Sequence, residues 1–466
     1  MFTLFLDRSS PVPLYEQIYK FIRAEIADGS IAVGTRMPSK RELARHLETS
    51  PVTVESAYAQ LVAEGYLESV LRSGHFVLAS PVAASSRKPL SEPIAEPQSI
   101  PKPLFDLTTG AVDPTLFPYA AWAKLARAVL AGPERDLLNA VHPQGSYALR
   151  TAISVHLADY RGIVADPAQI VVGAGSEYLT SLIVQLLGRD AAYAVEDPGY
   201  PKILRILAAN GARTIRIPVN RAGIDVKALR RTRATFVHVT PSHQFPTGVV
   251  MPIGRRRELL TWAAEGTGRY IIEDDYDSEF RFSGQPIPAL QGLDTAGCVI
   301  YMNSFTKSLA PSLRISYMVL PPDLLKRYRE ELGHYACTVS NFEQATLAKF
   351  MAEGRFERHL ARLRNAYKDR RDRLIAALYA SPLASIVEIV SADAGLHFLM
   401  KVANRMSENE LVESAAAAGI RLAGLSAYGG SASPGVFADA LVIGYAGIAA
   451  DRIETAVGLL SALWAR

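Results

Sequence analysis

Short apolar segments alternate with helix-like segments through the middle of this chain, and that alternation constrains the fold more than any other feature. Each apolar segment is only three to five residues long, too short for a buried helix. They lie at residues 170–172, 192–195, 214–217, 236–239, 270–273, 299–302 and 315–319. Strands separated by helices run mostly parallel and are covered by helices on both faces. The sequence therefore predicts an α/β fold with a three-layer αβα domain.

The pattern changes on both sides of this region. Residues 80–103 are dense in Pro, Ser and Ala without a hydrophobic period, which predicts a flexible linker, with a long surface loop inside one domain as the alternative. We place an N-terminal domain at residues 1–79. A large domain at 104–364 follows the linker. A long polar helix then begins a smaller α+β domain at 365–466.

The N-terminal domain has the order of elements of a DNA-binding module. Apolar residues at helical spacing in 12–28 are followed by helix-like segments at 40–47 and 51–64 and then by a hairpin pattern. That order is typical of a winged helix-turn-helix. Residues 1–80 hold 8 Lys and Arg against 9 Asp and Glu, so the domain is not basic as a whole. Its positive charge is local, at Arg36, Lys40, Arg41 and Arg45, which is sufficient for contact with phosphates.

A lysine flanked by hydroxyl residues indicates the chemistry of the large domain. Lys307 lies between Ser304, Thr306 and Ser308 and is followed by Arg314. An amine of this kind condenses with the aldehyde of pyridoxal phosphate (PLP) to give a Schiff base. The hydroxyls and the guanidinium can neutralise the phosphate through charge-assisted hydrogen bonds. The run therefore predicts a PLP site.

Other predicted strands are followed by residues suited to the same cofactor, because ligands bind at the carboxyl ends of strands in such sheets. Gly175, Ser176 and Glu177 open a helix whose backbone N–H groups can bind phosphate, or form an ordinary strand-to-helix turn. Tyr200 can stack on the pyridine ring or be a buried core residue. His243 can act as a general base or only form hydrogen bonds.

Carboxylates gather at residues 273–277, where their repulsion requires a compensating cation. The protonated pyridine nitrogen supplies one when it pairs with an aspartate, and Tyr276 can reach the phenolic oxygen. A metal site is the alternative, but no His or Cys ligand pattern lies nearby in the sequence, so we expect no metal.

Two sets of residues carry a resemblance to known families. Residues 12–79, with Gly34-Thr35-Arg36-Met37-Pro38-Ser39-Lys40-Arg41-Glu42-Leu43-Ala44, resemble the GntR-type winged helix. The cofactor segments resemble fold-type-I aminotransferases. The two joined in this order, with the strings at 240–248 and 273–281, resemble the MocR/GabR (also PdxR and TauR) family of PLP-dependent transcriptional regulators. The resemblance implies double-stranded operator DNA as a partner and a head-to-tail, domain-swapped homodimer.

The resemblance also implies roles for individual residues. Lys307 would carry the Schiff base, and Asp274, or else Asp275, would pair with the pyridine nitrogen. Tyr200 would stack and Tyr276 would hold the phenolic oxygen, with Ser304, Thr306 and Arg314 on the phosphate. The residues expected to contact DNA are Arg36, Ser39, Lys40, Arg41, Arg45, Thr49, Thr53 and Tyr58.

Several positions depart from the catalytic members of the fold. Phe245 stands where aminotransferases carry the asparagine of Asn-Pro-Thr-Gly, and Val442 stands where they bind the substrate carboxylate with arginine. Arg405 and Arg421 are nearby in sequence, with no reason to prefer either. We therefore expect a regulator that senses a small amine, an amino acid or PLP itself, with at most residual transaminase activity. The alternatives are an active aminotransferase with an accessory DNA-binding module, and a structural DNA-binding protein with an inactive cofactor site.

Composition restricts the setting of the protein. The two cysteines, Cys298 and Cys337, are too few for a disulfide framework, which fits a reducing cytoplasm. We find neither a signal peptide nor an apolar stretch of about 18 residues, so we expect a cytoplasmic protein without a membrane partner.

Overall fold

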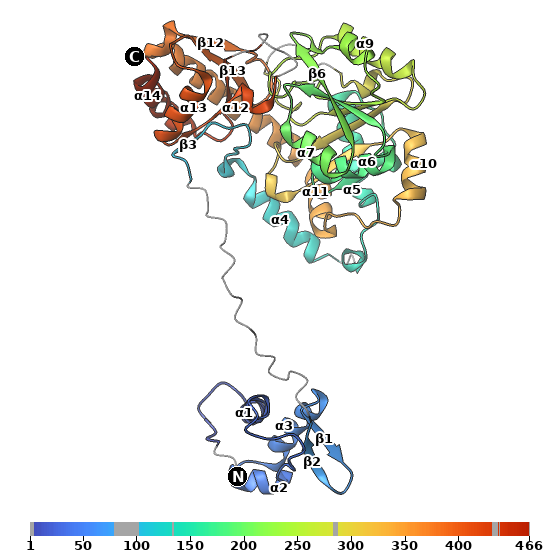
Figure 1. The fold of residues 1–466 in the computed structure, drawn as a ribbon, viewed down its shortest axis with the longest axis vertical. Helices are drawn as coiled ribbons and strands as arrows, with labels where there is room; N and C mark the ends of the chain where they lie inside the picture. The colour runs from blue at the N-terminus through green and yellow to red at the C-terminus, as the bar shows by residue number, and fades with distance from the viewer. Residues whose placement is uncertain are drawn as a thin grey trace. The chain divides into compact units, whose positions relative to one another are not determined.

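The chain forms two compact units, one within residues 1–101 and the other within 102–466 (Figure 1). The computed structural model describes residues 4–78, 102–132, 135–282, 288–430, 437 and 439–465. Residues 79–101, which contain most of the predicted linker, lie outside the described residues. Within the described part, none of the helices has the length and apolar character needed to cross a membrane.

The N-terminal unit is a winged helix. Its elements are α1 (Leu14–Ala27), α2 (Lys40–His46), α3 (Pro51–Ala63), β1 (Leu67–Val70) and β2 (Gly74–Val77), with β1 and β2 antiparallel. Ser39 and Glu42 form a capping box at the start of α2, and Ser50 caps α3 just before Pro51. Ile18, Val54 and Leu61 are among the residues of its own hydrophobic core. The predicted helix-turn-helix and hairpin are confirmed.

The second unit is built on an eight-stranded sheet. In spatial order the strands are β4 (Ile170–Gly173), β11 (Ser316–Val319), β10 (Val299–Ser304), β9 (Tyr270–Asp274), β8 (Phe236–Val239), β5 (Ala192–Asp197), β6 (Arg213–Asn220) and β7 (Gly223–Ile224). From β10 to β6 every neighbouring pair is parallel. Strand β11 is antiparallel to both of its neighbours, so it returns directly beside β10.

Helices cover both faces of this sheet. One face packs against α4 (Tyr119–Leu130), α5 (Tyr147–Arg161), α8 (Val226–Arg230), α9 (Ile253–Ala264) and α11 (Asn341–Ala352). The other packs against α6 (Ser176–Leu187), α7 (Pro201–Ala209) and α10 (Pro322–Glu331). Along β9, Ile271 and Ile272 belong to opposite layers of core, as the two-residue period of a strand requires. The predicted three-layer αβα architecture is confirmed.

A second sheet and its helices form what we call the small lobe. The long helix α12 (Arg355–Ala380) begins ten residues earlier than the predicted 365 and leads into it. The antiparallel sheet consists of β12 (Val387–Val390), β13 (His397–Val402), β16 (Ala440–Gly444) and β15 (Ala423–Gly424), with α13 (Glu408–Ala417) and α14 (Ile453–Trp464) packed on it. Strand β3 (Phe105–Asp106) pairs with β14 (Ile420–Arg421), which joins the start of this unit to the small lobe. Figure 1 shows the small lobe beside the large sheet.

Candidate functional site

The connection between β10 and β11 places Lys307 at the carboxyl end of the large sheet. Its amine is buried and donates a hydrogen bond to the backbone oxygen of Thr109. Burial lowers the pKa of Lys307, while the charge of Asp277 opposes that shift. A buried lysine with a lowered pKa is more readily unprotonated, which is the form that attacks a carbonyl carbon.

An anion-binding arrangement surrounds the start of α6. Gly175 has a φ of +95° and, having no side chain, does not cap the first N–H groups of the helix. A Cβ at this position would overlap the guanidinium of Arg314, and the positive φ disfavours residues other than glycine. The hydroxyls of Ser304 and Thr306 lie 2.5 Å apart on the same side of the sheet. N–H groups, hydroxyls and a guanidinium together suit a phosphate.

The carboxylate of Glu177 has partners that its position in the sequence does not indicate. Its carboxylate pairs with Arg314 and lies 2.5 Å from the amine of Lys202. Although burial opposes the shift, hydrogen bonds from Lys202 and Arg314 lower the pKa of Glu177 to about 2. These two ion pairs hold Lys202 and Arg314 beside the start of α6. Lys202, in the first turn of α7, was not singled out by the sequence.

The carboxylates at the end of β9 have separate partners. Glu273 accepts hydrogen bonds from the backbone N–H groups of Leu290 and Gln291 at 2.7 and 2.8 Å. Asp274 lies 3.4 Å from the Nε2 atom of His238 on the neighbouring strand β8. Glu273 and Asp274 thus have separate partners, but burial and the charge of Asp275 still raise the pKa of Glu273.

Asp275 is buried in the interior, where one of its carboxylate oxygens is paired. Its carboxylate lies 2.8 Å from the Nε atom of Arg161 and accepts a hydrogen bond from the hydroxyl of Tyr301 at 2.7 Å. Burial disfavours its charge, but Arg161 still lowers the pKa of Asp275. The structure thus distinguishes the two adjacent aspartates, because Asp275 has a buried cation of its own and Asp274 does not.

Aromatic rings line the space beside these carboxylates. Tyr200 is 41% exposed, and the charges of Glu177, Asp274 and Arg314 all act on its pKa, which burial raises. The ring of Phe245 lies edge-on to Tyr200 and Tyr276, with centroid distances of 5.5 and 6.0 Å. The structure therefore brings together, at one end of the sheet, the aromatic and acidic residues predicted from the sequence and those expected to bind a phosphate.

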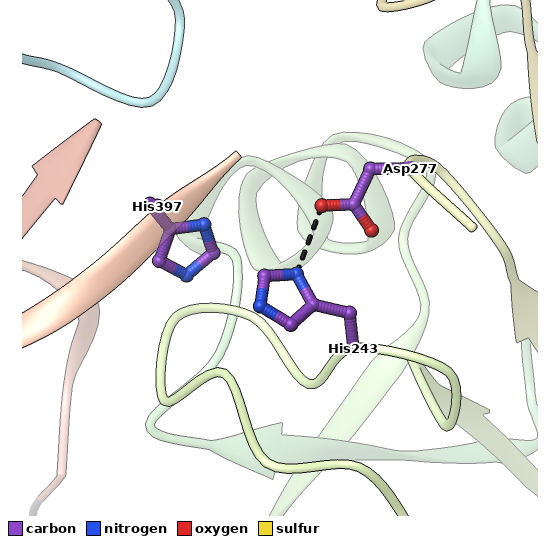
Figure 2. Close-up of side chains that lie close together, drawn as sticks. All are labelled: His243, Asp277 and His397. Atoms are coloured by element: carbon purple, nitrogen blue, oxygen red, sulfur yellow. Dashed lines mark hydrogen bonds and ion pairs between the residues drawn. The ribbon is translucent and has the colours of Figure 1, made fainter. Parts of the chain in front are cut away.

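Two histidines and an aspartate meet where the small lobe packs on the large sheet (Figure 2). The Nδ1 atom of His243 lies 2.8 Å from Asp277 and 3.0 Å from the hydroxyl of Tyr276. His397 of β13 lies beside His243, with ring centroids 4.6 Å apart. Their potential ligand atoms all lie within 4.8 Å of one another, so the set could hold a metal ion. His243 was predicted to form hydrogen bonds; His397 carries no local signal in the sequence.

The arginines considered for a carboxylate lie elsewhere. Arg421 forms an ion pair with Asp106, and Arg405 is exposed. Among the described residues neither interacts with Lys307. Val442 is completely buried in an apolar cluster of the small lobe.

Basic side chains of the winged helix point to solvent. Arg36, Arg41 and Arg45 are exposed. Lys40 is partly exposed and its amine lies 2.6 Å from Glu55 of α3. Ser39 and Thr53 both take part in the caps of α2 and α3, and Thr49 lies in the turn between those helices.

Tyr58 is the exception among the predicted DNA contacts. It is completely buried between the helices and its hydroxyl donates to the backbone oxygen of Pro38 at 3.0 Å. The structure therefore places Tyr58 in the core, where it fixes α3 against the segment before α2, and not on the outer surface of α3. Helical spacing predicts Tyr58 on the inward face of α3 with Val54, Ala57 and Leu61, and only the family resemblance implied a contact with DNA.

Two family models match the two units. Residues 14–77 match the bacterial regulatory proteins of the gntR family, and residues 102–433 match the class I and II aminotransferases. The second match covers most of the chain and includes the whole site around Lys307. It indicates pyridoxal 5'-phosphate as the cofactor, which the residues around Lys307 fit.

Full-length relatives have the same two parts. The chain is 39% identical to the HTH-type transcriptional regulator YdeL of Bacillus subtilis over 99% of both chains. It is 34% identical to the probable rhizopine catabolism regulatory protein MocR of Rhizobium meliloti, covering 96% of this chain and 92% of that protein. It is 31% identical to the pyridoxine biosynthesis regulator PdxR of Corynebacterium glutamicum over 91% of each.

Solved aminotransferases share the fold of the second unit. An archaeal alanine:glyoxylate aminotransferase superposes with a TM-score of 0.69 at 22% identity, covering 77% of this chain and 90% of that one. The multiple substrate aminotransferase of Thermococcus profundus gives a TM-score of 0.68 at 25% identity, covering 78% and 92%.

Proposed function

Because this chain belongs to the MocR/GabR family of HTH-type transcriptional regulators, which join a GntR winged helix to an aminotransferase domain, we propose that it senses a small amine, or PLP itself, through Lys307. The observation that carries the proposal is the buried amine of Lys307, with a lowered pKa, among groups suited to each part of the cofactor. When bound, PLP supplies an aldehyde that forms a Schiff base with an amine.

The residues divide by the part of the cofactor that they would hold. Asp274 would pair with the pyridine nitrogen, since Asp275 already pairs with Arg161. Tyr276 would hold the phenolic oxygen and Tyr200 would cover the ring. The phosphate would lie among the N–H groups of Gly175 and Ser176, the hydroxyls of Ser304 and Thr306, and Arg314. Glu177 would position Arg314 and Lys202 without touching the phosphate.

DNA recognition belongs to the N-terminal unit. We assign α3 to the major groove, and the exposed Arg36, Arg41 and Arg45 to phosphate contacts. Lys40 would join them once released from Glu55, and Ser39, Thr49 and Thr53 lie at the ends of the two helices that would face the duplex.

Dimerisation would set the distance between the two winged helices of a dimer. Support comes from apolar side chains that the second unit leaves exposed on α4 and α5. Tyr119 is 62% exposed, Leu130 66% and Tyr147 67%. Large apolar side chains left exposed in this way support an interface with another chain. We assign the cofactor to a large domain at residues 104–364, and we expect a small domain at 365–466 to move when the effector binds.

Footprinting on the DNA upstream of its own gene tests the regulator. The full-length protein would be compared with and without PLP, beside Lys307→Ala. We expect two protected half-sites whose protection changes with PLP, and Lys307→Ala to lose both that response and the visible absorbance of the bound cofactor. Absence of protection in every condition, together with turnover of amines by the loaded protein, would instead support the active aminotransferase.

A further inference from the structure

A cavity of about 560 Å³ lies where the large domain meets the small lobe. The large domain contributes residues 158–162, 242–243, 277–281 and 288 to its wall. The remaining wall consists of Arg364 on α12, which leads into the small lobe, and of Ala394 and Gly395, which precede β13. The cavity has the size of a small-molecule site, and none of the described residues assigned above to PLP lines it. It is therefore distinct from the cofactor site.

Three guanidinium groups line this cavity, and they differ in their partners. Arg161 forms an ion pair with Asp275, which satisfies its charge. Arg364 donates from its Nε atom to the backbone oxygen of Glu279 at 2.6 Å. The Nε atom of Arg281 is buried and has no hydrogen-bond partner among the described residues. The cavity thus contains a buried cationic donor that its own wall leaves unsatisfied.

The charges of Arg281 and Arg364 lack a counter-charge. Within the described part of the chain, neither side chain forms an ion pair. The adjacent residues 283–287, which lie outside the described residues, include no Asp or Glu in the sequence. A buried donor without an acceptor costs free energy. Carboxylates and phosphates remove this cost, because their oxygens can accept two parallel hydrogen bonds from one guanidinium.

The acidic residues of the wall do not offset these two arginines fully. Asp277 is hydrogen-bonded to His243 at 2.8 Å (Figure 2), and Asp159 is exposed. Burial, with the charge of Asp275, raises the pKa of Glu279 to about 7. Glu279 is therefore only partly ionised at neutral pH. Two guanidiniums without ion pairs then face one carboxyl group of partial charge.

The backbone fixes Arg281 at the junction of the large domain and the small lobe. Arg281 forms an isolated antiparallel bridge with Ala394. Beside it, the N–H group of Gly395 donates to the backbone oxygen of Phe280 at 2.7 Å. An anion shared by Arg281 and Arg364 therefore connects this junction to α12.

We propose that this cavity is a second ligand site, separate from the PLP site, which binds a small ligand through a carboxylate or phosphate group held by Arg281 and Arg364. The anionic oxygens supply the acceptor that the buried Nε atom of Arg281 lacks. Because the wall includes the large domain, α12 and the segment before β13, a bound anion favours one position of the small lobe on the large domain.

Anions without an amino group test the proposal, because they cannot condense with PLP. The full-length protein, loaded with PLP and freed of excess by gel filtration, would be titrated with succinate, inorganic phosphate and succinamide by isothermal calorimetry at constant ionic strength. We expect one succinate or phosphate to bind per chain. Succinamide, the neutral diamide of the same shape, should bind at least about tenfold more weakly than succinate. The tighter of the two anions identifies the group as a carboxylate or a phosphate.

Variants of the two arginines locate the site. Arg281→Gln and Arg364→Gln should each weaken binding of the tighter anion at least about tenfold, because each removes charge-assisted hydrogen bonds. Arg373→Gln is the matched control, since Arg373 lies on α12 and pairs with Asp369 at the surface. It should leave the affinity unchanged. Cofactor absorbance and far-UV circular dichroism show whether each variant keeps PLP and is folded.

Glu279→Gln offers a gain of affinity, which loss of folding would not produce. The Glu279 side chain accepts a hydrogen bond from Asn303 at 3.3 Å and faces the charges of Asp275 and Arg161. At pH 8 its carboxylate is mostly ionised and repels an anionic ligand. The neutral amide should therefore bind succinate at least about threefold more tightly at this pH.

Three results would overturn the site. The first is the absence of saturable binding by either anion, or binding of succinamide as tight as that of succinate. The second is an unchanged affinity in both Arg281→Gln and Arg364→Gln, which would place the anion elsewhere in the protein. The third is loss of the cofactor absorbance as the anion is added, which would show that it displaces PLP instead of occupying a separate cavity.

Discussion

Adjacent aspartates differ in role because different residues meet them. Asp275 faces Arg161 in the interior, whereas Asp274, the residue before it, faces His238 at the end of the strand. Successive side chains of a strand point to opposite faces of a sheet, so neighbours in sequence enter different surroundings. Only Asp274 is therefore available to pair with a cationic group of the cofactor.

Substitution of Asp275 should mainly reduce stability, whereas substitution of Asp274 should mainly weaken PLP binding. Asp275→Asn leaves Arg161 buried without its counter-charge, so we expect the free energy of unfolding to fall by about 3 kcal/mol. Asp274→Asn should change stability by less than about 1 kcal/mol, since its partner is a histidine 3.4 Å away. It should nevertheless weaken PLP binding at least about tenfold. Urea unfolding of the apoprotein and a PLP titration measure the two quantities, and equal loss of stability in both variants would contradict this assignment.

Residue types around the site could be predicted, but several partners could not. Lys307, Arg314 and Asp274 follow predicted strands, and their chemistry matches parts of one cofactor. His397 approaches His243 only because β13 packs against the large sheet, 154 positions along the chain. Lys202 likewise gains its importance from Glu177. Contacts between distant segments leave no local pattern to read.

Two buried histidines on α5 and α12 should make stability depend on pH. Burial lowers the pKa of His156 and of His359 to about 4 in the folded protein. Unfolded histidines titrate near about 6.5, so the unfolded chain binds more protons between the two values. The free energy of unfolding should therefore fall as the pH falls from about 6.5 to 4, by up to about 3 kcal/mol for each histidine.

Chemical unfolding at pH 7 and pH 5 measures this slope. His156→Phe keeps the ring contacts with Tyr160 and Phe356 and should reduce the slope by about half. His334→Phe, at an exposed position, should leave it unchanged. A slope in His156→Phe as steep as that of the unmodified protein would show that other groups control the acid response.

The helix-turn-helix makes a prediction at the scale of elements. Arg41 lies exposed in the first turn of α2, which Ser39 caps. If it neutralises one phosphate, Arg41→Ala should weaken binding to all DNA sequences alike and reduce the slope of log affinity against log salt by about 1. Lys20→Ala, on α1 and paired with Glu16, is the control and should change neither. An altered base preference in Arg41→Ala would instead indicate direct contact with bases.

Element boundaries were predictable where caps and periodicity agree. The start of α2 at Lys40 follows from Ser39 and Glu42, and that of α3 at Pro51 from Ser50. The start of α12 was placed too late because its first turns are apolar as well as charged and pack into the large domain through Phe356 and Leu360. Because the two ends of α12 pack into different cores, its apolar residues follow no single pattern from which the first residue of the helix could be predicted.

At the scale of the whole molecule, the two units have separate cores and should fold separately. Among the described residues, the hydrophobic cluster of the winged helix ends at Val77, and the clusters of the second unit begin at Phe105. A protein consisting of residues 102–466 should therefore keep the PLP absorbance and the affinity for amines, but lose DNA binding. Absorbance titration and gel-shift assays compare it with the full chain. Loss of cofactor binding on removal of residues 1–101 would show that the first unit contributes to the site.

The return of β11 beside β10 has a consequence for how such sites can arise. Phe305 donates to the backbone oxygen of Ile315, and Ser304 is opposite Ser316, so one antiparallel pair closes the segment containing both Lys307 and Arg314. The spacing between the reactive amine and the phosphate-binding guanidinium is then set within a single hairpin connection. Such a segment can be inherited, or transferred by design, as one continuous piece of chain. The parts of the fold around it can then change in sequence without altering the spacing of these two residues.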